Sequence, residues 1–448
     1  MESELPVSSA VASPPKNMNT FLAIWGSQLV SILGSGLTSF GLGVFIYNQT
    51  HQATPFAITV LFGSLPRVIF APFAGALVDR WDRRKVMMLA DGGDALTVLA
   101  VAAVFLTGRL EIWMIYLAAF ISALCNTFQE PAYAASVVML VPKEQLGRAN
   151  GMIQAAQSVE LLLSPILAGA LFAWIGLGGI ILIDFVTFLV AVGALLVVRI
   201  PQPAKSQPSG EDVRAFLKDA AFGWKYLKAR PALFVLLWYF ALVNFFLNMS
   251  GVLVPPMVLT WTNSVGLGVV EMVSGIGMLV GSILISAWGG FKRRILGVLG
   301  FIALAGVGML VMGLRPNPVV IGVGFFILMF SVPIASASSQ AIFQLKVAPE
   351  VQGRAFAIRG MISRSIMPVA FLVSGPLADR IFEPMMRAGG ALANGPVTAL
   401  LGNGPGRGMG IMFVLSGLLM LAATGVIASL SRIRNVEREL PDAVPGAG

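Results

Sequence analysis

The feature of this sequence that most limits its fold is a series of long apolar blocks. A helix rises about 1.5 Å per residue, so a block of roughly 20 residues crosses a hydrocarbon core of about 30 Å. Of the 448 residues, 57% are hydrophobic and 11% are charged, whereas soluble domains contain about 25% charged residues. The chain is therefore predicted to be an all-α membrane protein, and a water-soluble enzyme is excluded.

Clusters of glycine, proline and charge divide the apolar blocks into twelve predicted spans. These spans cover residues 21–47, 55–78, 86–107, 112–140, 150–174, 176–198, 232–258, 268–288, 295–314, 318–345, 355–378 and 409–430. The two blocks that meet at Gly176 can also be read as one long block. We expect two spans there.

The basic residues are divided unevenly between the two sides of the predicted bundle. With both termini on one side, five of the 30 Lys and Arg residues fall on the opposite side, namely Arg109, Arg315, Arg380, Arg387 and Arg407. Cytoplasmic loops carry an excess of Lys and Arg, so both termini are predicted to be cytoplasmic. The predicted parts are a tail at 1–20, a six-helix half at 21–198, a linker at 199–231, a second six-helix half at 232–430 and a tail at 431–448.

The predicted linker contains an amphipathic stretch. Its apolar residues fall at helical spacing: Val213, Phe216, Leu217, Ala220, Trp224 and Leu227. The basic residues lie largely on the other side, which is typical of a helix on an anionic membrane surface. A solvated linker helix is an equal alternative.

Two short strings recur at similar offsets. Gly147-Arg148-Ala149 returns as Gly353-Arg354-Ala355, and Arg83-Arg84-Lys85 returns as Lys292-Arg293-Arg294. Each pair falls in corresponding loops of the two predicted halves. The repeats favour two related halves around a central pathway, as in a secondary carrier.

Several kinds of chemistry have no counterpart in the sequence. Cys125 is the only cysteine and His51 the only histidine, which leaves no thiolate metal cluster and no two-histidine zinc motif. The GxxxxGK[ST] phosphate-binding loop does not occur. No metal, cofactor or enzymatic activity is predicted.

The string GALVDRWDRRK, from Gly75 to Lys85, resembles the loop between the second and third helices of the major facilitator superfamily. Asp82 stands where that pattern has glycine. Gly75 permits close helix packing, and Asp79 can meet a helix N-terminus or a basic partner across the two halves. The resemblance implies a cytoplasmic gate formed by Gly75, Asp79, Arg80, Arg83, Arg84 and Lys85.

The fifth predicted span resembles the antiporter signature of the same superfamily. The ungapped match places Gly151, Ser164, Pro165 and Gly169 at signature positions and Glu160 at a position that usually holds glycine. Small residues permit tight packing and Pro165 bends the helix. Generic helix packing would explain the same residues.

The strings FLAIWGSQLVSILGSGL, QEPAYAASVVMLVPKEQLGRANG and IDFVTFL resemble a narrower branch, the macrolide-efflux and enterobactin-exporter-like facilitators. This resemblance implies the twelve-helix major facilitator fold and proton-driven export of amphipathic molecules. The fourth-span arginine that this branch often carries is replaced by Ser122, so its role must lie elsewhere or be absent.

Ionised groups are costly in hydrocarbon and usually face a cavity or one another. The candidates for proton coupling are Glu160, Asp184 and Glu130. Glu160 lies about midway along its span, with Arg67 as the expected cationic partner. Asp184 is expected to bond polar groups within its half, and Glu130 precedes Pro131 and can satisfy freed backbone groups. The candidates for the cavity wall are Arg67, Gln28, Arg364 and Asn244.

The sequence thus predicts a monomeric secondary exporter in the bacterial cytoplasmic membrane. Its partners would be an amphipathic small molecule such as a macrolide or siderophore, protons and lipid, with no nucleic acid. A uniporter or importer would share every topological feature. A non-transporting membrane protein is less well supported, because the acidic residues are scattered.

The predicted orientation can be tested with single cysteines. Trp81→Cys and Phe291→Cys, each in a Cys125→Ala background, should both resist an impermeant thiol reagent applied to intact cells, because both basic loops are expected in the cytoplasm. Permeabilised cells provide the positive control. Labelling of either cysteine from outside would overturn the orientation.

Overall fold

The computed structural model describes residues 18–78, 81–142, 145–198, 213–402 and 404–439. Its long helices follow the apolar blocks closely. They are α1 (Met18–Thr50), α2 (Ala53–Val78), α3 (Arg83–Leu106), α4 (Ile112–Leu140), α5 (Leu146–Val197), α7 (Pro231–Leu259), α8 (Ser264–Trp288), α9 (Arg294–Leu314), α10 (Pro318–Lys346), α11 (Pro349–Leu377) and α14 (Arg407–Ser429). Within the described residues, these eleven helices are long and apolar enough to cross a membrane.

Shorter helices complete the chain. The predicted linker contains α6 (Val213–Lys228), although its preceding residues 199–212 lie outside the described part. After α11 come a π-helical turn η2 (Ala378–Phe382), α12 (Glu383–Met386) and α13 (Pro396–Leu401). The chain then ends its described part with α15 (Ser431–Arg434) and α16 (Val436–Glu439).

The 52-residue helix α5 consists of two arms that meet at Gly176. Gly176 has φ 66° and ψ −174°, a backbone conformation that essentially only glycine adopts. Both arms pack against the same part of α1, because Gly36 faces Ser164 of the first arm while Gly34 faces Asp184 of the second. The arms are therefore antiparallel, and counting them separately gives the twelve predicted spans.

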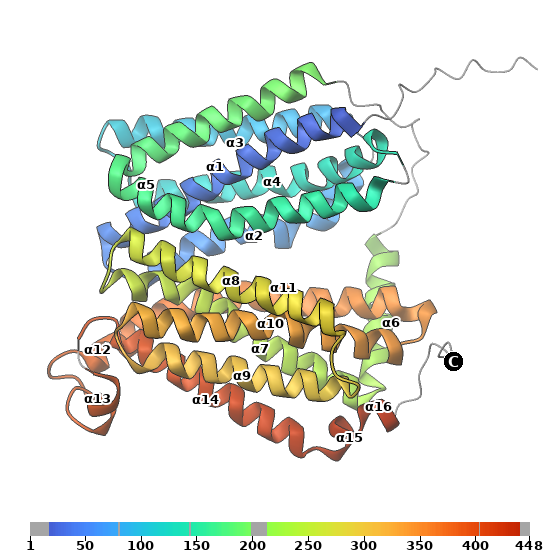
Figure 1. Ribbon diagram of the computed structural model, residues 1–448, viewed down its shortest axis with the longest axis vertical. Helices are drawn as coiled ribbons and strands as arrows, with labels where there is room; N and C mark the ends of the chain where they lie inside the picture. The colour runs from blue at the N-terminus through green and yellow to red at the C-terminus, as the bar shows by residue number, and fades with distance from the viewer. Residues whose placement is uncertain (1–17, 79–80, 143–144, 199–212, 403, 440–448) are drawn as a thin grey trace, which may run out of the picture.

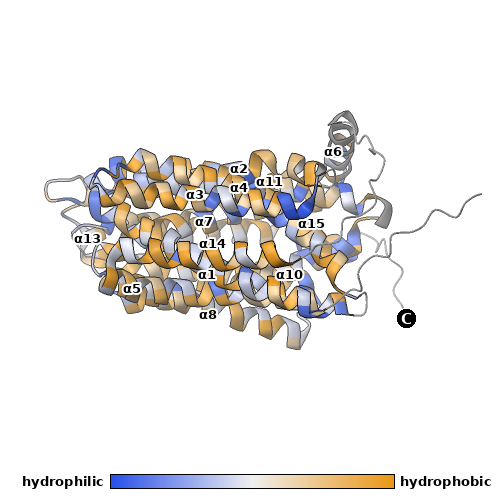
Figure 2. Ribbon diagram, turned by 90° about the horizontal axis from the view of Figure 1, so that it is seen from above, coloured by the Kyte–Doolittle hydropathy of each residue, from blue (hydrophilic) through white to orange (hydrophobic). Residues whose placement is uncertain are grey.

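The helices form two halves that lie side by side (Figure 1), α1 to α5 in one and α7 to α14 in the other. We call the end where α1 begins and α14 ends the terminal end, and the opposite end the distal end. The halves meet along two seams, α5 against α8 and α2 against α11. Figure 2 shows hydrophilic residues gathered toward the two ends of the bundle, with an apolar band between them.

Asp82, the residue that departs from the family loop pattern, begins α3. Its carboxylate accepts hydrogen bonds from the backbone N–H groups of Arg84 and Lys85 at 3.0 and 3.2 Å. The first N–H groups of a helix have no partner within the helix, and aspartate is among the preferred residues for capping them. The departure therefore has a local structural role.

The described end of α6 packs on the second half. Leu227 is fully buried, and Trp224 packs edge-on against Phe234 of α7. The Tyr226 hydroxyl accepts a hydrogen bond from the Ala348 N–H at 3.2 Å, just before α11. The apolar side of this part of α6 therefore faces protein. The side chains of residues 213–220 lie outside the described part.

The turn at Gly176 predicts a stability effect. Gly176→Ala should lower the stability of the protein by about 1–3 kcal/mol, because an L side chain is strained at this φ and ψ. Gly193→Ala, in a helical part of the same α5 with open space around it, should be neutral or slightly stabilising. Unfolding temperatures in detergent would measure both, and equal effects would contradict the role assigned to the turn.

Candidate functional site

The first seam between the halves joins the middle of α5 to the distal part of α8. The backbone of Gly169 touches that of Ser264, whose hydroxyl donates a hydrogen bond to the Gly169 carbonyl at 2.9 Å. Gly268 lies directly against the backbone of Pro165, and Gly275 lies against Leu162. Small residues at these positions allow the two helices to touch.

Three residues of the antiporter-like signature therefore lie in or beside this seam. Pro165 and Gly169 contact α8, while Ser164 is buried against Gly36 of α1. Gly151 is exposed and lies more than three turns before Ser164 on α5. The main role of the signature residues Pro165 and Gly169 is therefore to form the surface of α5 that contacts α8.

The second seam joins the distal ends of α2 and α11. Gly375 of α11 lies against the Cα of Thr54, and the Asp379 carboxylate accepts hydrogen bonds from the N–H groups of Ala53 and Thr54. The hydroxyls of Tyr47 and Thr260 form a further bond of 2.6 Å between the halves. The halves are thus in contact at the distal end along both seams.

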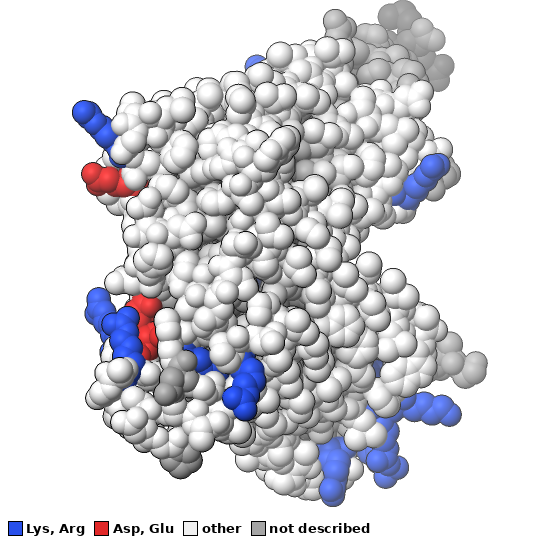
Figure 3. All heavy atoms as spheres, turned by 60° about the vertical axis from the view of Figure 1, so that its left-hand side comes forward, with Lys and Arg blue, Asp and Glu red and all other residues white. Residues whose placement is uncertain are grey.

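Toward the terminal end, polar groups in the middle of the helices become exposed. The clearest case is the ion pair between Arg67 of α2 and Glu130 of α4, at 3.0 Å, with 59% and 62% of their side chains exposed. A charged pair in mid-helix faces water in preference to hydrocarbon. Figure 3 shows the molecular outline indented between the two halves. The distal seams and this indentation indicate a hollow between the halves, closed distally and open toward the terminal end.

The ion pair corrects the expected partner of Arg67. We expected Arg67 to pair with Glu160, whereas it pairs with Glu130. The reason is the lateral order of the helices, since α2 packs beside α4. No ion pair to Glu160 is formed by any cation in the described part of the chain.

Glu160 lies beside the first seam. The next two residues, Leu161 and Leu162, already approach Gly275 of α8. The Glu160 side chain is half-buried and faces Gly36 of α1, beside the buried hydroxyl of Ser164. That hydroxyl has no hydrogen-bond partner among the described residues. Glu160 is therefore an acid on α5 directly beside the surface where the two halves touch.

Asp184 has a different position. It is buried inside the first half, where it accepts a hydrogen bond of 3.3 Å from the Ser35 hydroxyl. The absence of a side chain at Gly34 lets α1 approach it closely. This environment agrees with the expectation that Asp184 bonds polar groups within its own half.

Gln28 connects three helices of the first half through polar contacts. Its amide nitrogen donates to Asp91 Oδ2 at 3.3 Å, and its amide oxygen accepts from Gln129 at 3.1 Å. One turn after Asp91, Asp94 lies beside Ser122, the position of the arginine in the resembled branch. Gln28 was expected at the cavity wall, but its contacts with Asp91 and Gln129 were not predicted. Asp91 lies six residues after Lys85, and no spacing in the sequence indicated its contact with Gln28.

In the second half, the two predicted cavity residues differ in their contacts. Arg364 is exposed on α11, whereas the Asn244 amide donates to the Phe240 carbonyl of its own helix at 2.8 Å. Arg359, which was not among the predicted cavity residues, donates to Gln340 Oε1 at 2.8 Å and to Ser339 Oγ at 3.1 Å. Its guanidinium also lies over the Phe343 ring, so it ties α11 to α10.

The predicted gate loop is partly described. Arg83 donates to the Ala135 carbonyl at 3.0 Å, and Arg84 donates to the carbonyls of Leu195 and Leu196 at 2.8 and 2.7 Å. These bonds hold α3 to α4 and α5 within the first half, while Lys85 is exposed. Asp79 and Arg80 lie outside the described residues, and Gly75 lies in the last turn of α2.

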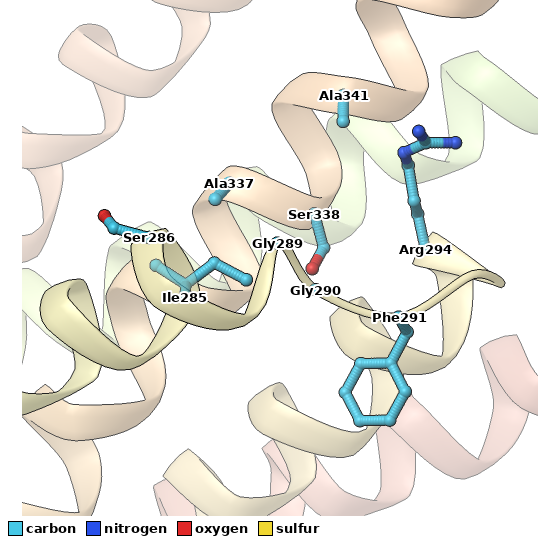
Figure 4. A pocket seen from close by; sticks show the side chains of 9 residues that line it. All are labelled: Ile285, Ser286, Gly289, Gly290, Phe291, Arg294, Ala337, Ser338 and Ala341. Atoms are coloured by element: carbon cyan, nitrogen blue, oxygen red, sulfur yellow. The ribbon is translucent and has the colours of Figure 1, made fainter.

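A separate cavity of about 290 Å³ lies near the terminal end of the second half (Figure 4). It is lined by residues from α8, α9, α10 and the loop between α8 and α9, including Ile285, Phe291, Arg294 and Ser338. Because all its walls belong to one half, movement between the halves would not open it to the other side. It is therefore distinct from the hollow between the halves.

Comparison with known proteins agrees with this arrangement. The family model described as Major Facilitator Superfamily matches residues 24–371. Macrolide efflux protein A of Streptococcus pyogenes is 30% identical over 435 residues, covering 93% of this chain and 97% of that protein. Macrolide efflux protein A of Enterococcus faecalis is 33% identical over 327 residues, covering 69% and 96%.

A solved structure has a similar fold. The crystal structure of a bacterial homologue of the iron transporter ferroportin, in an inward-facing state, matches with a TM-score of 0.66. The alignment covers 93% of this chain and 100% of that chain, at 14% sequence identity. At this identity the match concerns the fold alone.

The hydrated position of Glu130 predicts a small stability effect. Glu130→Gln should change the free energy of unfolding by less than about 1 kcal/mol, because a pair this exposed is well solvated. Glu383→Gln provides the contrast, since Glu383 is buried and caps α14 through the Gly406 and Met409 N–H groups. Glu383→Gln should lower the free energy of unfolding by about 1–3 kcal/mol. Denaturant unfolding in detergent measures both, and a loss of 3 kcal/mol at Glu130 would place the pair in a dry environment.

Proposed function

The chain belongs to the major facilitator superfamily, and on that premise we propose that it exports amphipathic small molecules, macrolides among them, by proton antiport. It would act as a monomer in the bacterial cytoplasmic membrane, through alternating access between the terminal and distal ends. The two relatives named for macrolide efflux support the direction and the substrate class. The structural observation that supports alternating access is the hollow between the halves, which is closed at the distal end.

The basic loops give the proposal its orientation. Arg83, Arg84 and Lys85 lie at the terminal end together with Lys292 to Arg294 of the second half. Under the positive-inside rule this end faces the cytoplasm. The hollow would then load substrate from the cytoplasm or the inner leaflet, and closure of this end with opening of the distal seams would release it outside.

The glycine contacts between α5 and α8 would allow the two halves to separate at the distal end. Helix association in lipid depends on packing and hydrogen bonds, because there is no hydrophobic difference between a helix surface and lipid tails. The α5 and α8 backbones touch at Gly169 and Gly268, with one hydrogen bond from Ser264. A seam of this kind separates without leaving a large apolar surface in water.

Glu160 is our candidate for the coupling proton. It is half-buried beside the seam, and under alternating access its contact with water would change as the halves move. An acid that reaches different sides in the two states can take up a proton from one and release it to the other. Glu130 is already paired with Arg67, and Asp184 is bonded inside its half, which makes both less suited to this role.

The loop from Gly75 to Lys85 keeps its proposed role at the cytoplasmic gate. This assignment comes from the resemblance of the loop to the family pattern, because Asp79 and Arg80 lie outside the described residues. Asp79 would hold the terminal end shut when the distal end is open. The energy difference between two such states is a few kcal/mol, which one capping contact changes substantially.

The test of coupling uses proteoliposomes with an imposed pH gradient and a radiolabelled macrolide. Glu160→Gln should abolish uphill, proton-driven transport, because the amide cannot carry a proton, while substrate exchange without a gradient continues. Glu111→Gln, an exposed acid before α4 that bonds Trp113, is the matched control and should transport like the parent.

Three outcomes separate the parts of this proposal. Loss of uphill transport with retained exchange supports Glu160 as the proton carrier. Unchanged uphill transport in Glu160→Gln would make Glu160 structural and would move the assignment to Asp184. A parent protein that moves no macrolide under any gradient would contradict the proposed substrate class.

A further inference from the structure

The end of α11 carries a second copy of the gate signature. Gly375-Pro-Leu377-Ala-Asp379-Arg380 matches Gly75-Ala-Leu77-Val-Asp79-Arg80 at the glycine, leucine, aspartate and arginine positions. The two strings lie at opposite ends of the bundle, since α2 ends at the terminal end and α11 at the distal end. The duplication of halves pairs α2 with α8, so it does not account for this match.

The inverted repeats within each half of a carrier explain why the two strings lie at opposite ends of the bundle. In major facilitator proteins each six-helix half contains two three-helix units of opposite topology. α2 is the middle helix of the first unit, and α11 is the middle helix of the last. A signature at the C-terminal end of one would then reappear on the other side of the membrane in the other.

The distal copy makes direct contacts across the halves. Asp379 Oδ1 accepts from the Ala53 N–H at 2.9 Å, and Asp379 Oδ2 accepts from the Thr54 N–H at 2.6 Å. Gly375, one turn earlier, lies so close to Thr54 that a Cβ there would be 2.6 Å from the Thr54 Cα. The glycine therefore permits the approach that brings the carboxylate to the start of α2.

The Asp379 carboxylate accepts hydrogen bonds from backbone N–H groups at the start of α2 that have no acceptor within α2. The first N–H groups of a helix have no acceptor within it and carry the positive end of the helix dipole. A carboxylate capping them forms charge-assisted hydrogen bonds. Here the cap comes from the opposite half, so it is broken whenever the distal ends of α2 and α11 separate.

Glu383, a neighbouring acid, caps a helix of its own half and, within the described part of the chain, makes no such contact across the halves. Glu383 lies one turn after Asp379, but its carboxylate accepts from the Gly406 and Met409 N–H groups of its own half. Both acids line a small cavity of about 160 Å³ together with Tyr47, His51 and Thr260. Glu383 stabilises the second half in every state, whereas Asp379 stabilises only the distally closed state.

We propose that Gly375 and Asp379 form the distal latch of the carrier, which holds the distal end shut by capping α2 and releases it when the halves move. The inference rests on alternating access as proposed above. The latch is the counterpart, on the other side of the membrane, of the gate assigned to the Gly75–Lys85 loop. Asp379 acts here on the balance between states and touches no substrate.

Distances between spin labels test the latch without any substrate. Cysteines replace Arg109 and Val319, which are exposed at the distal ends of the two halves, in a Cys125→Ala background. Asp379→Asn should raise the ratio of distally open to distally closed protein by about tenfold, since it removes the charge from two charge-assisted hydrogen bonds. Gly375→Ala should raise it as well, because the added Cβ pushes α11 away from Thr54.

Glu383→Gln is the matched control. It should lower the unfolding temperature while leaving the distance ratio at the parent value, because it breaks a cap within one half. An unchanged ratio in Asp379→Asn would overturn the latch, and so would an equal rise in Glu383→Gln. Since no macrolide or proton gradient is involved, failure of the latch is distinct from failure of the proposed transport activity.

Discussion

The structure depends on one constraint, that a backbone in hydrocarbon must satisfy its own hydrogen bonds. Helices meet this constraint along their length and leave it unmet at their ends. The ends of these helices are accordingly where the chain places its capping acids. Asp82 caps α3 and Glu383 caps α14, each from within its own half. Asp379 caps α2 from the other half, which turns the same requirement into a contact that depends on the position of the halves.

Close packing without hydrophobic attraction is the second consequence of the lipid environment. The α5–α8 seam uses Gly169, Gly268 and Gly275, and the α2–α11 seam uses Gly375. Glycine gives close van der Waals contact and keeps the number of interlocking side chains small. The seams therefore hold the distal end together through contacts that can be exchanged for lipid or water when the halves separate.

Most of the fold could be predicted from the sequence, because span length and apolar composition are local properties. The turn at Gly176 was predicted from one glycine between two apolar blocks, and the structure places a glycine-only conformation there. The lateral order of helices is not local, which is why the expected Arg67–Glu160 pair was wrong and Glu130 is the partner. Gln28, Asp91 and Gln129 come from three helices, so no spacing in the sequence indicated that they would meet.

The position of Glu160 connects the first seam with the proposed proton coupling. Glu160 and the first seam are adjacent on α5, since Leu161, Leu162 and Pro165 are the residues that meet α8. Any movement that opens the distal seam must therefore change the surroundings of Glu160 at the same time. A proton bound there alters the charge beside the seam, and movement of the seam alters the access of water to the carboxyl. Under the alternating access proposed here, linkage would make the two effects equal and reciprocal, so the position of Glu160 on α5 supports its proposed role in coupling.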